Sequence, residues 1–227
     1  MYYNIYSERC DNLKFDIIVA DPPWDYKNNQ SYDSTRGGIP YSALSSEVLE
    51  NLKLHEIAND DALLFLWATS PRLPQAISFI EANGFEYCTV AFNWIKLNRN
   101  SDIKYIPNNN KKMPDVLIDG GIYSGMGYYT NSQSEFVLVG RKGRMLRRVD
   151  KSVKQLVFSP VNAHSEKPIK VNENIELLYG NKSYVEIFAR VPSKRIGNWT
   201  FVGNEVGPDY LDIRDALAKI KNDTYYD

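Results

Sequence analysis

Apolar and polar positions follow two different spacings along the chain. The segments 15–20 and 62–68 are apolar apart from Asp16, which is typical of strands buried on both faces of a parallel sheet. Further strands are predicted at 87–96, 135–140, 154–160, 183–190 and 198–207. Apolar residues at helical spacing predict helices at 45–58, 70–84, 167–180 and about 209–222. Because strands and helices alternate, we expect an α/β fold with a mainly parallel sheet.

The predicted helices carry residues that commonly begin and end helices. Ser45 precedes the first as an N-cap, and Pro168 lies in the first turn of the third. Gly84 and Gly180 follow the last turns of two of them. The pattern lapses between residues 97 and 127, where the chain is polar and rich in Asn and Gly. We expect a long polar loop there, and such a loop in a compact domain is usually functional or mobile.

Composition narrows the class of protein without identifying it. A chain of 227 residues with 43% apolar and 24% charged residues suits one globular domain, 1–227. Its net charge of −1 excludes a global basic field, so any polyanion site must be a local patch. Cys10 and Cys88 lack metal-ligand spacing and predict free thiols in a reducing, cytoplasmic setting. No apolar run approaches the roughly 20 residues that span a bilayer, so we expect no membrane segment.

The first apolar run leads directly into Asp21, Pro22, Pro23 and Trp24. In an α/β sheet, sites lie beyond the carboxyl ends of the strands, where this tetrapeptide falls. The exocyclic amine of a base is a poor nucleophile, because its lone pair is delocalised into the ring. Two rigid acceptors, the Asp21 carboxylate and the Pro22 carbonyl, would favour its attack by stabilising the developing positive charge. Trp24 would offer a face for base stacking; the alternative is a stiff turn in which Trp24 caps the core.

The tetrapeptide and later blocks together resemble the adenine N6-methyltransferases related to the seventy-kilodalton subunit of the eukaryotic mRNA adenosine methyltransferase. The blocks are IPYSALSSEVL, ALLFLWATSPRLPQA, FNWIK, GMGYYTNSQSEFVLVGRKG, HSEKP, VEIFAR and NWTFVGNEV. They cover about residues 13–207 and look most like the bacterial and phage branch of the family. The resemblance implies a Rossmann-like methyltransferase fold, a permuted motif order and S-adenosylmethionine as methyl donor. No metal is implied.

The resemblance also assigns a donor site. Lys167 would meet the carboxylate of the donor, and Asp21 could also accept a hydrogen bond from its ammonium group. Glu186 and Arg190 are four residues apart, so on one strand they would share a face and order the pocket near the ribose. Asn204 and Glu205 would bind the ribose and the adenine edge. Taken alone, Lys167 and Pro168 could simply begin a helix.

The acceptor side is assigned less directly. Tyr41 and Lys96 would line the base, and Tyr128, Asn131 and Glu135 would lie in a gate over the site. Core packing is the simpler interpretation of Trp67 and Trp94. The segment 141–148 carries five positive charges and no acid, so we expect phosphate contacts from Arg141, Lys142 and Arg144, although such runs are often only a solvated face.

We therefore predict a site-specific methyltransferase that modifies the N6 amine of adenine in DNA. A duplex target would require base flipping. The alternatives are methylation of adenosine in RNA and a non-catalytic nucleic-acid-binding subunit of the same fold. Nothing in the sequence reads a 2′-hydroxyl recognisably. The oligomeric state, monomer or homodimer, and the target sequence are left open.

Overall fold

The computed structural model describes residues 2–7, 14–24, 44–106, 115–127, 129–162, 166–190, 198–203 and 211–221. Its strands are β1 (Tyr2–Ser7), β2 (Phe15–Ala20), β3 (Ala58–Ala68), β4 (Glu86–Leu97), β5 (Asp102–Ile106), β6 (Asp115–Asp119), β7 (Ser134–Lys142), β8 (Leu156–Pro160), β9 (Ser183–Ile187), β10 (Asn198–Gly203) and β11 (Leu211–Asp212). Its α-helices are α1 (Ser46–Glu50), α2 (Leu73–Ala82), α3 (Ile169–Tyr179) and α4 (Ile213–Lys221), with 3₁₀ turns at Leu54–Glu56 and Ser70–Arg72.

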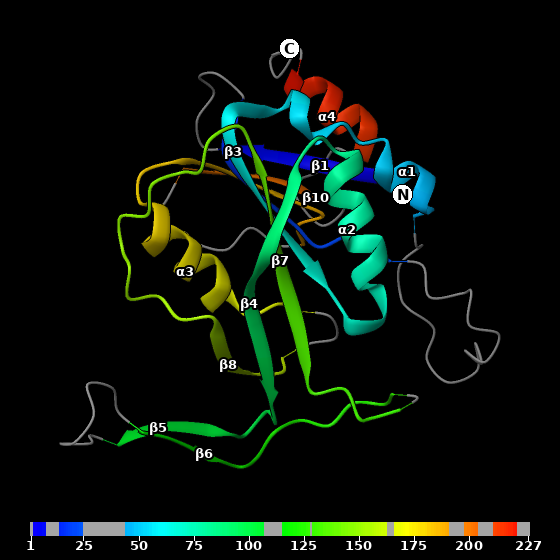
Figure 1. The fold of residues 1–227 in the computed structure, drawn as a ribbon. Helices are drawn as coiled ribbons and strands as arrows, with labels where there is room; N and C mark the ends of the chain where they lie inside the picture. Colours follow the sequence, from blue (N-terminus) through cyan, green and yellow to red (C-terminus); the bar gives the residue numbers. More distant parts are fainter. Residues whose placement is uncertain are drawn as a thin grey trace.

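Nine of the described strands form one sheet in the order β11-β1-β10-β9-β2-β3-β7-β4-β8. The pairs β10–β9, β9–β2, β2–β3 and β4–β8 are parallel, whereas β1 and β7 are antiparallel to both of their neighbours. Seven of the nine strands therefore point the same way, which confirms the predicted mainly parallel α/β sheet. β5 and β6 form a separate two-stranded sheet that extends beyond the main one (Figure 1).

Helices cover both faces of the sheet and create two separate cores. On one face, α1, α2 and α4 pack with residues such as Leu49, Phe79 and Leu217. On the other face, α3 packs through Val171 and Ile175. The apolar run of β2 is shared between the two: Ile18 and Ala20 belong to the first core, and Ile17 and Val19 belong to the second. This alternation explains why the run contains almost no polar residue.

The helix ends follow mostly from local chemistry. The Ser45 hydroxyl accepts a hydrogen bond from the Val48 N–H at 3.3 Å, which confirms the predicted cap of α1. The helix predicted over 45–58 is shorter, because Lys53 adopts a left-handed conformation with φ of 55° and interrupts it. Gly84, with φ of 84°, and Gly180, with φ of 67°, follow α2 and α3 as predicted.

Several expectations about elements need correction. The segment expected as a long polar loop contains β5 and β6, two five-residue strands too short to stand out from the polar residues around them. The strand predicted over 183–190 ends at Ile187, because Phe188 has a φ of 63°. β1 and β11 were not predicted. None of the described helices is both long and apolar enough to cross a membrane.

Candidate active site

Four charged side chains converge at the edge of the sheet where the parallel strands end. Asp21 directly follows β2, Lys96 lies at the end of β4, and Lys167 precedes α3. Glu135 lies at the start of β7, and this antiparallel strand begins at the edge where its neighbours end. The sheet thus brings together residues up to 146 positions apart in sequence.

The four side chains form a ladder of alternating charge. The Lys167 ammonium lies 2.7 Å from the Asp21 carboxylate and 3.5 Å from the Glu135 carboxylate. Glu135 in turn accepts a hydrogen bond from the Lys96 ammonium at 2.5 Å. Each interior member therefore has an opposite charge on both sides, which compensates part of the cost of removing charges from water.

The two carboxylates of this ladder respond differently to it. Burial raises the pKa of Asp21 above its ordinary value of 3.8, and the attraction of Lys167 only partly offsets the rise. Burial also acts on Glu135, but Lys167 and Lys96 outweigh it and lower the pKa of that carboxyl below its ordinary value. Asp21 nevertheless keeps 32% of its side chain exposed, so it combines an energetically costly charge with access from solvent.

Two tryptophans form a wall behind the ammonium groups. Lys167 lies over Trp67, 5.5 Å from the ring centroid, and Lys96 lies over Trp94 at 5.1 Å. The rings pack edge to face with centroids 6.1 Å apart, and the Trp94 indole N–H donates to the Ser159 carbonyl at 2.9 Å. Both side chains are only 3% exposed, as expected for core residues. They also hold the lysines in place by cation–π contacts, which the sequence analysis did not anticipate.

The turn after β2 differs from the expected arrangement at Trp24. Its side chain is 7% exposed and packs edge-on against Phe79, with ring centroids 6.0 Å apart. Its indole N–H donates to the Trp67 carbonyl at 3.2 Å. The expectation that Trp24 offers an open face for base stacking is therefore corrected. Trp24 caps the core instead, because α2 supplies an apolar surface for its ring. Trp24 holds the turn rather than offering a free surface in this arrangement.

The carbonyl of Pro22 is already engaged in the same turn. It accepts a hydrogen bond from the Trp24 N–H at 2.8 Å. A carbonyl oxygen has two lone pairs, so one acceptor position of Pro22 is left for a further donor. The Pro23 carbonyl accepts from Leu44 N–H at 3.3 Å, which ties the turn to the chain just before α1.

Glu186 and Arg190, two of the predicted donor-side residues, lie near this cluster. Glu186, in β9, accepts a hydrogen bond from the Asn172 side chain of α3 at 2.9 Å, a partner that the sequence analysis missed. Arg190 lies beyond the break at Phe188, so simple strand alternation does not relate it to Glu186. Its positive charge is close enough to lower the pKa of Asp21 slightly. Asn204 and Glu205 lie outside the described residues.

The predicted acceptor-side residues divide into three groups. Lys96 and Glu135 belong to the ladder. Asn131 is exposed, on the chain between β6 and β7. Tyr41 and Tyr128 lie outside the described residues.

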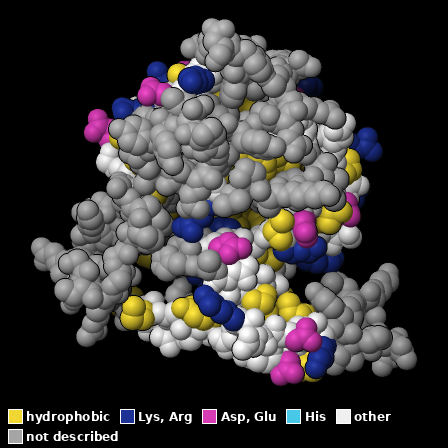
Figure 2. Space-filling view, turned by 180° about the vertical axis from the view of Figure 1, so that it is seen from behind, with side chains coloured by type: hydrophobic (Ala, Val, Ile, Leu, Met, Phe, Trp, Pro, Cys, Tyr) yellow, Lys and Arg dark blue, Asp and Glu magenta, His cyan; other side chains and the backbone are white. Residues whose placement is uncertain are grey.

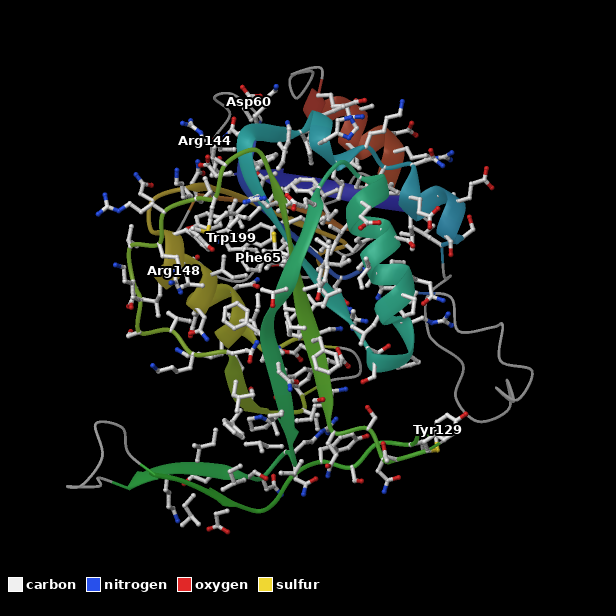
Figure 3. All side chains as sticks on the ribbon, viewed as in Figure 1. Asp60, Phe65, Tyr129, Arg144, Arg148 and Trp199 are labelled. Atoms are coloured by element: carbon white, nitrogen blue, oxygen red, sulfur yellow. The ribbon has the colours of Figure 1, made fainter. Side chains whose placement is uncertain are left out.

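The basic residues Arg141, Lys142 and Arg144 lie at the opposite edge of the sheet. Lys142 is paired with Ala62 in the register of β7 and β3, whereas Asp21 follows Ala20, which is paired with Leu66. Figure 3 shows Arg144 beside Asp60, far from Tyr129 at the other edge. These three residues therefore lie away from Asp21, and the phosphate contacts expected of them stay a prediction.

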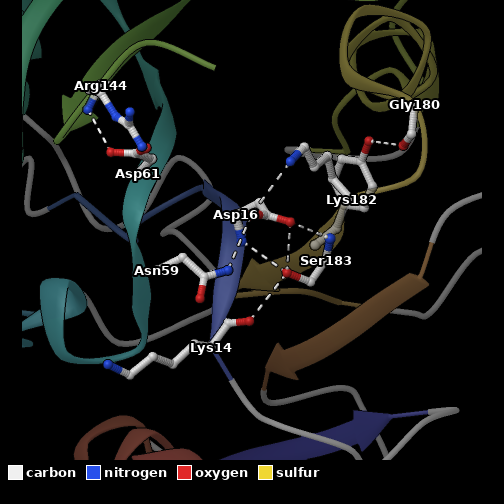
Figure 4. Close-up of polar contacts among 9 residues, drawn as sticks. Lys14, Asp16, Asn59, Asp61, Arg144, Gly180, Lys182 and Ser183 are labelled. Carbon is white, nitrogen blue, oxygen red and sulfur yellow. Dashed lines mark hydrogen bonds and ion pairs between the residues drawn. The ribbon is translucent and has the colours of Figure 1, made fainter. Parts of the chain in front are cut away.

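Their charges are also occupied within the protein. Arg141 forms an ion pair with Glu86 at 2.5 Å. Arg144 forms one with Asp61 at 2.9 Å, shown in Figure 4. The Lys142 ammonium donates to two backbone carbonyls, at 3.0 and 3.1 Å. The sequence could not show these partners, because they are far away along the chain.

Comparison with known proteins places this arrangement in a family. The MT-A70 family model matches residues 15–117 and 119–205, which include all four members of the charge ladder. The chain belongs to the MT-A70 family. This membership confirms the resemblance stated from the sequence and the Rossmann-like methyltransferase fold that it implied.

Several individual methyltransferases also align over most of this chain. It is 31% identical over 217 residues to the type II methyltransferase M.MunI of Mycoplasma sp, covering 88% of this chain and 81% of that protein. It is 26% identical over 208 residues to the human N(6)-adenosine-methyltransferase catalytic subunit METTL3, covering 92% of this chain but 31% of METTL3. It is 25% identical over 203 residues to the human N(6)-adenine-specific methyltransferase METTL4, and spans 37% of that protein.

Proposed function

We propose that this MT-A70 methyltransferase transfers the methyl group of S-adenosylmethionine to the exocyclic N6 amine of adenine in DNA. The observation that carries the proposal is the position of Asp21. Its carboxylate is partly exposed at the carboxyl edge of the sheet, in a proline-stiffened turn, and Lys167 holds it at 2.7 Å. A fixed acceptor of this kind suits an amine that becomes positively charged as it reacts.

The contribution of Asp21 follows from its environment. A carboxylate whose pKa is raised by burial is a stronger hydrogen-bond acceptor than one in water, and little solvent has to reorganise around it. It would accept a hydrogen from the adenine amine, and the free lone pair of the Pro22 carbonyl would accept the second. Both acceptors favour the pyramidal, positively charged geometry that the nitrogen adopts during attack.

The residues present fit the proposed methyl donor. The amino-acid end of S-adenosylmethionine is a zwitterion, and Asp21 and Lys167 offer an adjacent anion and cation that both reach solvent. When bound, the donor supplies an electrophilic methyl group. Lys167 would bind its carboxylate and Asp21 its ammonium. Glu186, Arg190, Asn204 and Glu205 would contact its ribose and adenine.

Coverage of the relatives supports DNA as the substrate. The chain accounts for 81% of the length of the type II methyltransferase M.MunI, and its motifs resemble the bacterial and phage branch of the family most. It accounts for only 31% of METTL3, named for adenosine methylation. We infer that the protein methylates DNA in the cytoplasm, as a monomer or homodimer. We also propose that Tyr41, Tyr128 and Asn131 line the path of the target base.

Methyl transfer from labelled donor to defined oligonucleotides tests this function. We expect N6-methyladenine in DNA, and Asp21→Asn to lower the rate by about a hundredfold or more. Asp60→Asn, the same change on an exposed residue at the opposite edge, is the matched control and should retain the wild-type rate. Label found only in RNA would favour the alternative substrate. Full transfer by Asp21→Asn would refute the role of the carboxylate.

A further inference from the structure

Residues 143–155, here named the basic strap, cross the outside of α3 between β7 and β8 (Figure 1). The strap is attached to the rest of the fold along its length. Arg144 binds Asp61 at its start, and the Val149 N–H donates to the Leu178 carbonyl at 2.7 Å near its middle. At its end, the Gln155 side chain donates to the Val90 carbonyl at 2.8 Å. The strap is therefore fixed on the surface at three places.

The side chains of the basic strap are sorted by polarity. Leu146 and Val153 face inward and pack into the core beneath α3. Four cations are exposed: Arg147, Arg148, Lys151 and Lys154. Figure 3 shows Arg148 beside α3, on the outside of the molecule. Tethered backbone and inward anchors thus present a row of positive charges to solvent.

These four cations differ from the neighbouring basic residues in having no acidic partner among the described residues. Arg141 and Arg144 are neutralised by Glu86 and Asp61. The single acid within the strap, Asp150, accepts hydrogen bonds from the Ser152 N–H at 2.6 Å and the Ser152 hydroxyl at 2.7 Å. The strap is therefore a local positive field on a chain whose net charge is −1.

We propose that the basic strap binds the phosphate backbone of duplex DNA several base pairs away from the target adenine. This rests on the proposed function and relocates the phosphate contacts predicted for Arg141, Lys142 and Arg144. The strap leads into β8, whose Ser159 contacts Trp94 at the catalytic edge. From Lys154 to Pro160 the strand covers roughly 20 Å, the length of about six base pairs. Only a duplex that extends about six base pairs beyond the target adenine reaches both the basic strap and the edge of the sheet that holds Asp21.

The test compares two pairs of substitutions of equal charge. Arg147→Ser/Lys151→Ser removes two strap cations, and Lys14→Ser/Lys219→Ser removes two exposed cations elsewhere. Binding to a duplex of about 30 base pairs is followed by fluorescence anisotropy as the salt concentration rises. Each lost phosphate contact should flatten the slope of log K, the association constant, against log salt concentration by about 0.9. Wild type should therefore lose roughly tenfold more affinity than the strap variant between 50 and 200 mM salt.

Duplex length provides the second measurement. The strap variant should raise KM for the long duplex and leave it unchanged for a duplex of about eight base pairs centred on the target, which is too short to reach the strap. The control variant should match wild type on both. The charge-conserving variant Arg147→Lys/Lys151→Arg should keep the wild-type salt slope.

The outcomes separate this proposal from the proposed function. If wild type methylates neither duplex, the proposed function fails, while the salt slopes still test the strap. If the strap and control variants share the wild-type slope and KM, the four cations are only a solvated face and the strap proposal is overturned.

Discussion

At the scale of single residues, the site depends on how one lysine is shared between two carboxylates. Lys167 contacts Asp21 at 2.7 Å and Glu135 at 3.5 Å. Asp21 has the closer contact, yet its pKa stays raised, because the effect of burial exceeds the attraction of Lys167. The negative charge of Glu135 raises the pKa of Asp21 further. Glu135 therefore adjusts the ionisation of Asp21 as well as holding Lys96 and Lys167.

Glu135→Gln should consequently lower the pKa of Asp21. The substitution removes a negative charge and leaves the Lys167 ammonium to Asp21 alone, and both effects favour the ionised form. If ionised Asp21 is required, kcat/KM falls as the pH drops through its pKa, which in wild type lies above 3.8. The acid limb of the pH profile should therefore move to lower pH in the variant.

Glu135→Asp is the matched control, because it keeps the charge and should keep the limb near the wild-type position. An unmoved limb in Glu135→Gln, or one displaced to higher pH, would contradict the proposed coupling. A mere loss of rate at every pH would not reproduce the expected shift, so a purely structural defect is distinguishable.

The sequence predicted the members of the charge ladder but not their surroundings. Asp21, Lys96, Glu135 and Lys167 were named from motif and resemblance, and all four meet in the fold. Trp24 was misjudged, because a sequence gives the residue type but not the direction of its side chain. The acids that pair with Arg141 and Arg144 could not be predicted, because they are far away in the chain.

At the scale of elements, one buried amide joins three short segments. The Asn83 side chain accepts from the Leu54 N–H at 3.2 Å and donates to the Leu49 and Phe79 carbonyls at 3.0 and 2.9 Å. It is fully buried, and it connects α1, the following 3₁₀ turn and α2. These three hydrogen bonds hold together α1, the 3₁₀ turn and α2, in the region where the helix predicted from the sequence is interrupted.

Asn83→Ala should lower the free energy of unfolding by about 3 kcal/mol, because the buried Leu54 N–H and the Leu49 carbonyl lose the partner that the Asn83 side chain supplies. Urea denaturation measures the loss. Asn51→Ala, at an exposed position whose side chain donates to one carbonyl, is the control and should cost about 1 kcal/mol or less. Equal costs for the two would show that the buried contacts of Asn83 contribute little.

The elements themselves were predictable where the pattern was long and of one kind. The run at 15–20 and the helix bounded by Pro168 and Gly180 were predicted at their observed positions. The direction of β7 was not predictable, since apolar content does not distinguish parallel from antiparallel pairing. That direction is what places Glu135 at the catalytic edge, so this part of the site required the structure.

At the scale of the whole molecule, the two edges of the sheet have different tasks. The charge ladder and its partly exposed carboxylate lie at the carboxyl edge. A partly buried hydrogen-bond network lies at the amino edge, where Asp16 of β2 accepts from the N–H and the hydroxyl of Ser183 at 3.0 and 3.2 Å (Figure 4). Asn59 of β3 donates to the same carboxylate at 3.1 Å. On the face seen in Figure 2, Lys and Arg side chains lie beside Asp and Glu side chains.

Ser183→Ala should therefore weaken the fold without changing the chemistry. The Asp16 N–H donates to the Ser183 hydroxyl at 2.9 Å, and this donor would lose its partner at a cost of about 1–3 kcal/mol. The free energy of unfolding should fall by that amount, while kcat and KM for methyl transfer at 25 °C stay at wild-type values. Ser78→Ala, at an exposed position of α2, should leave both properties nearly unchanged. A fall in kcat with unaltered stability would contradict this prediction. It would mean that a change at the amino edge reaches the charge ladder through the strands β2 and β9.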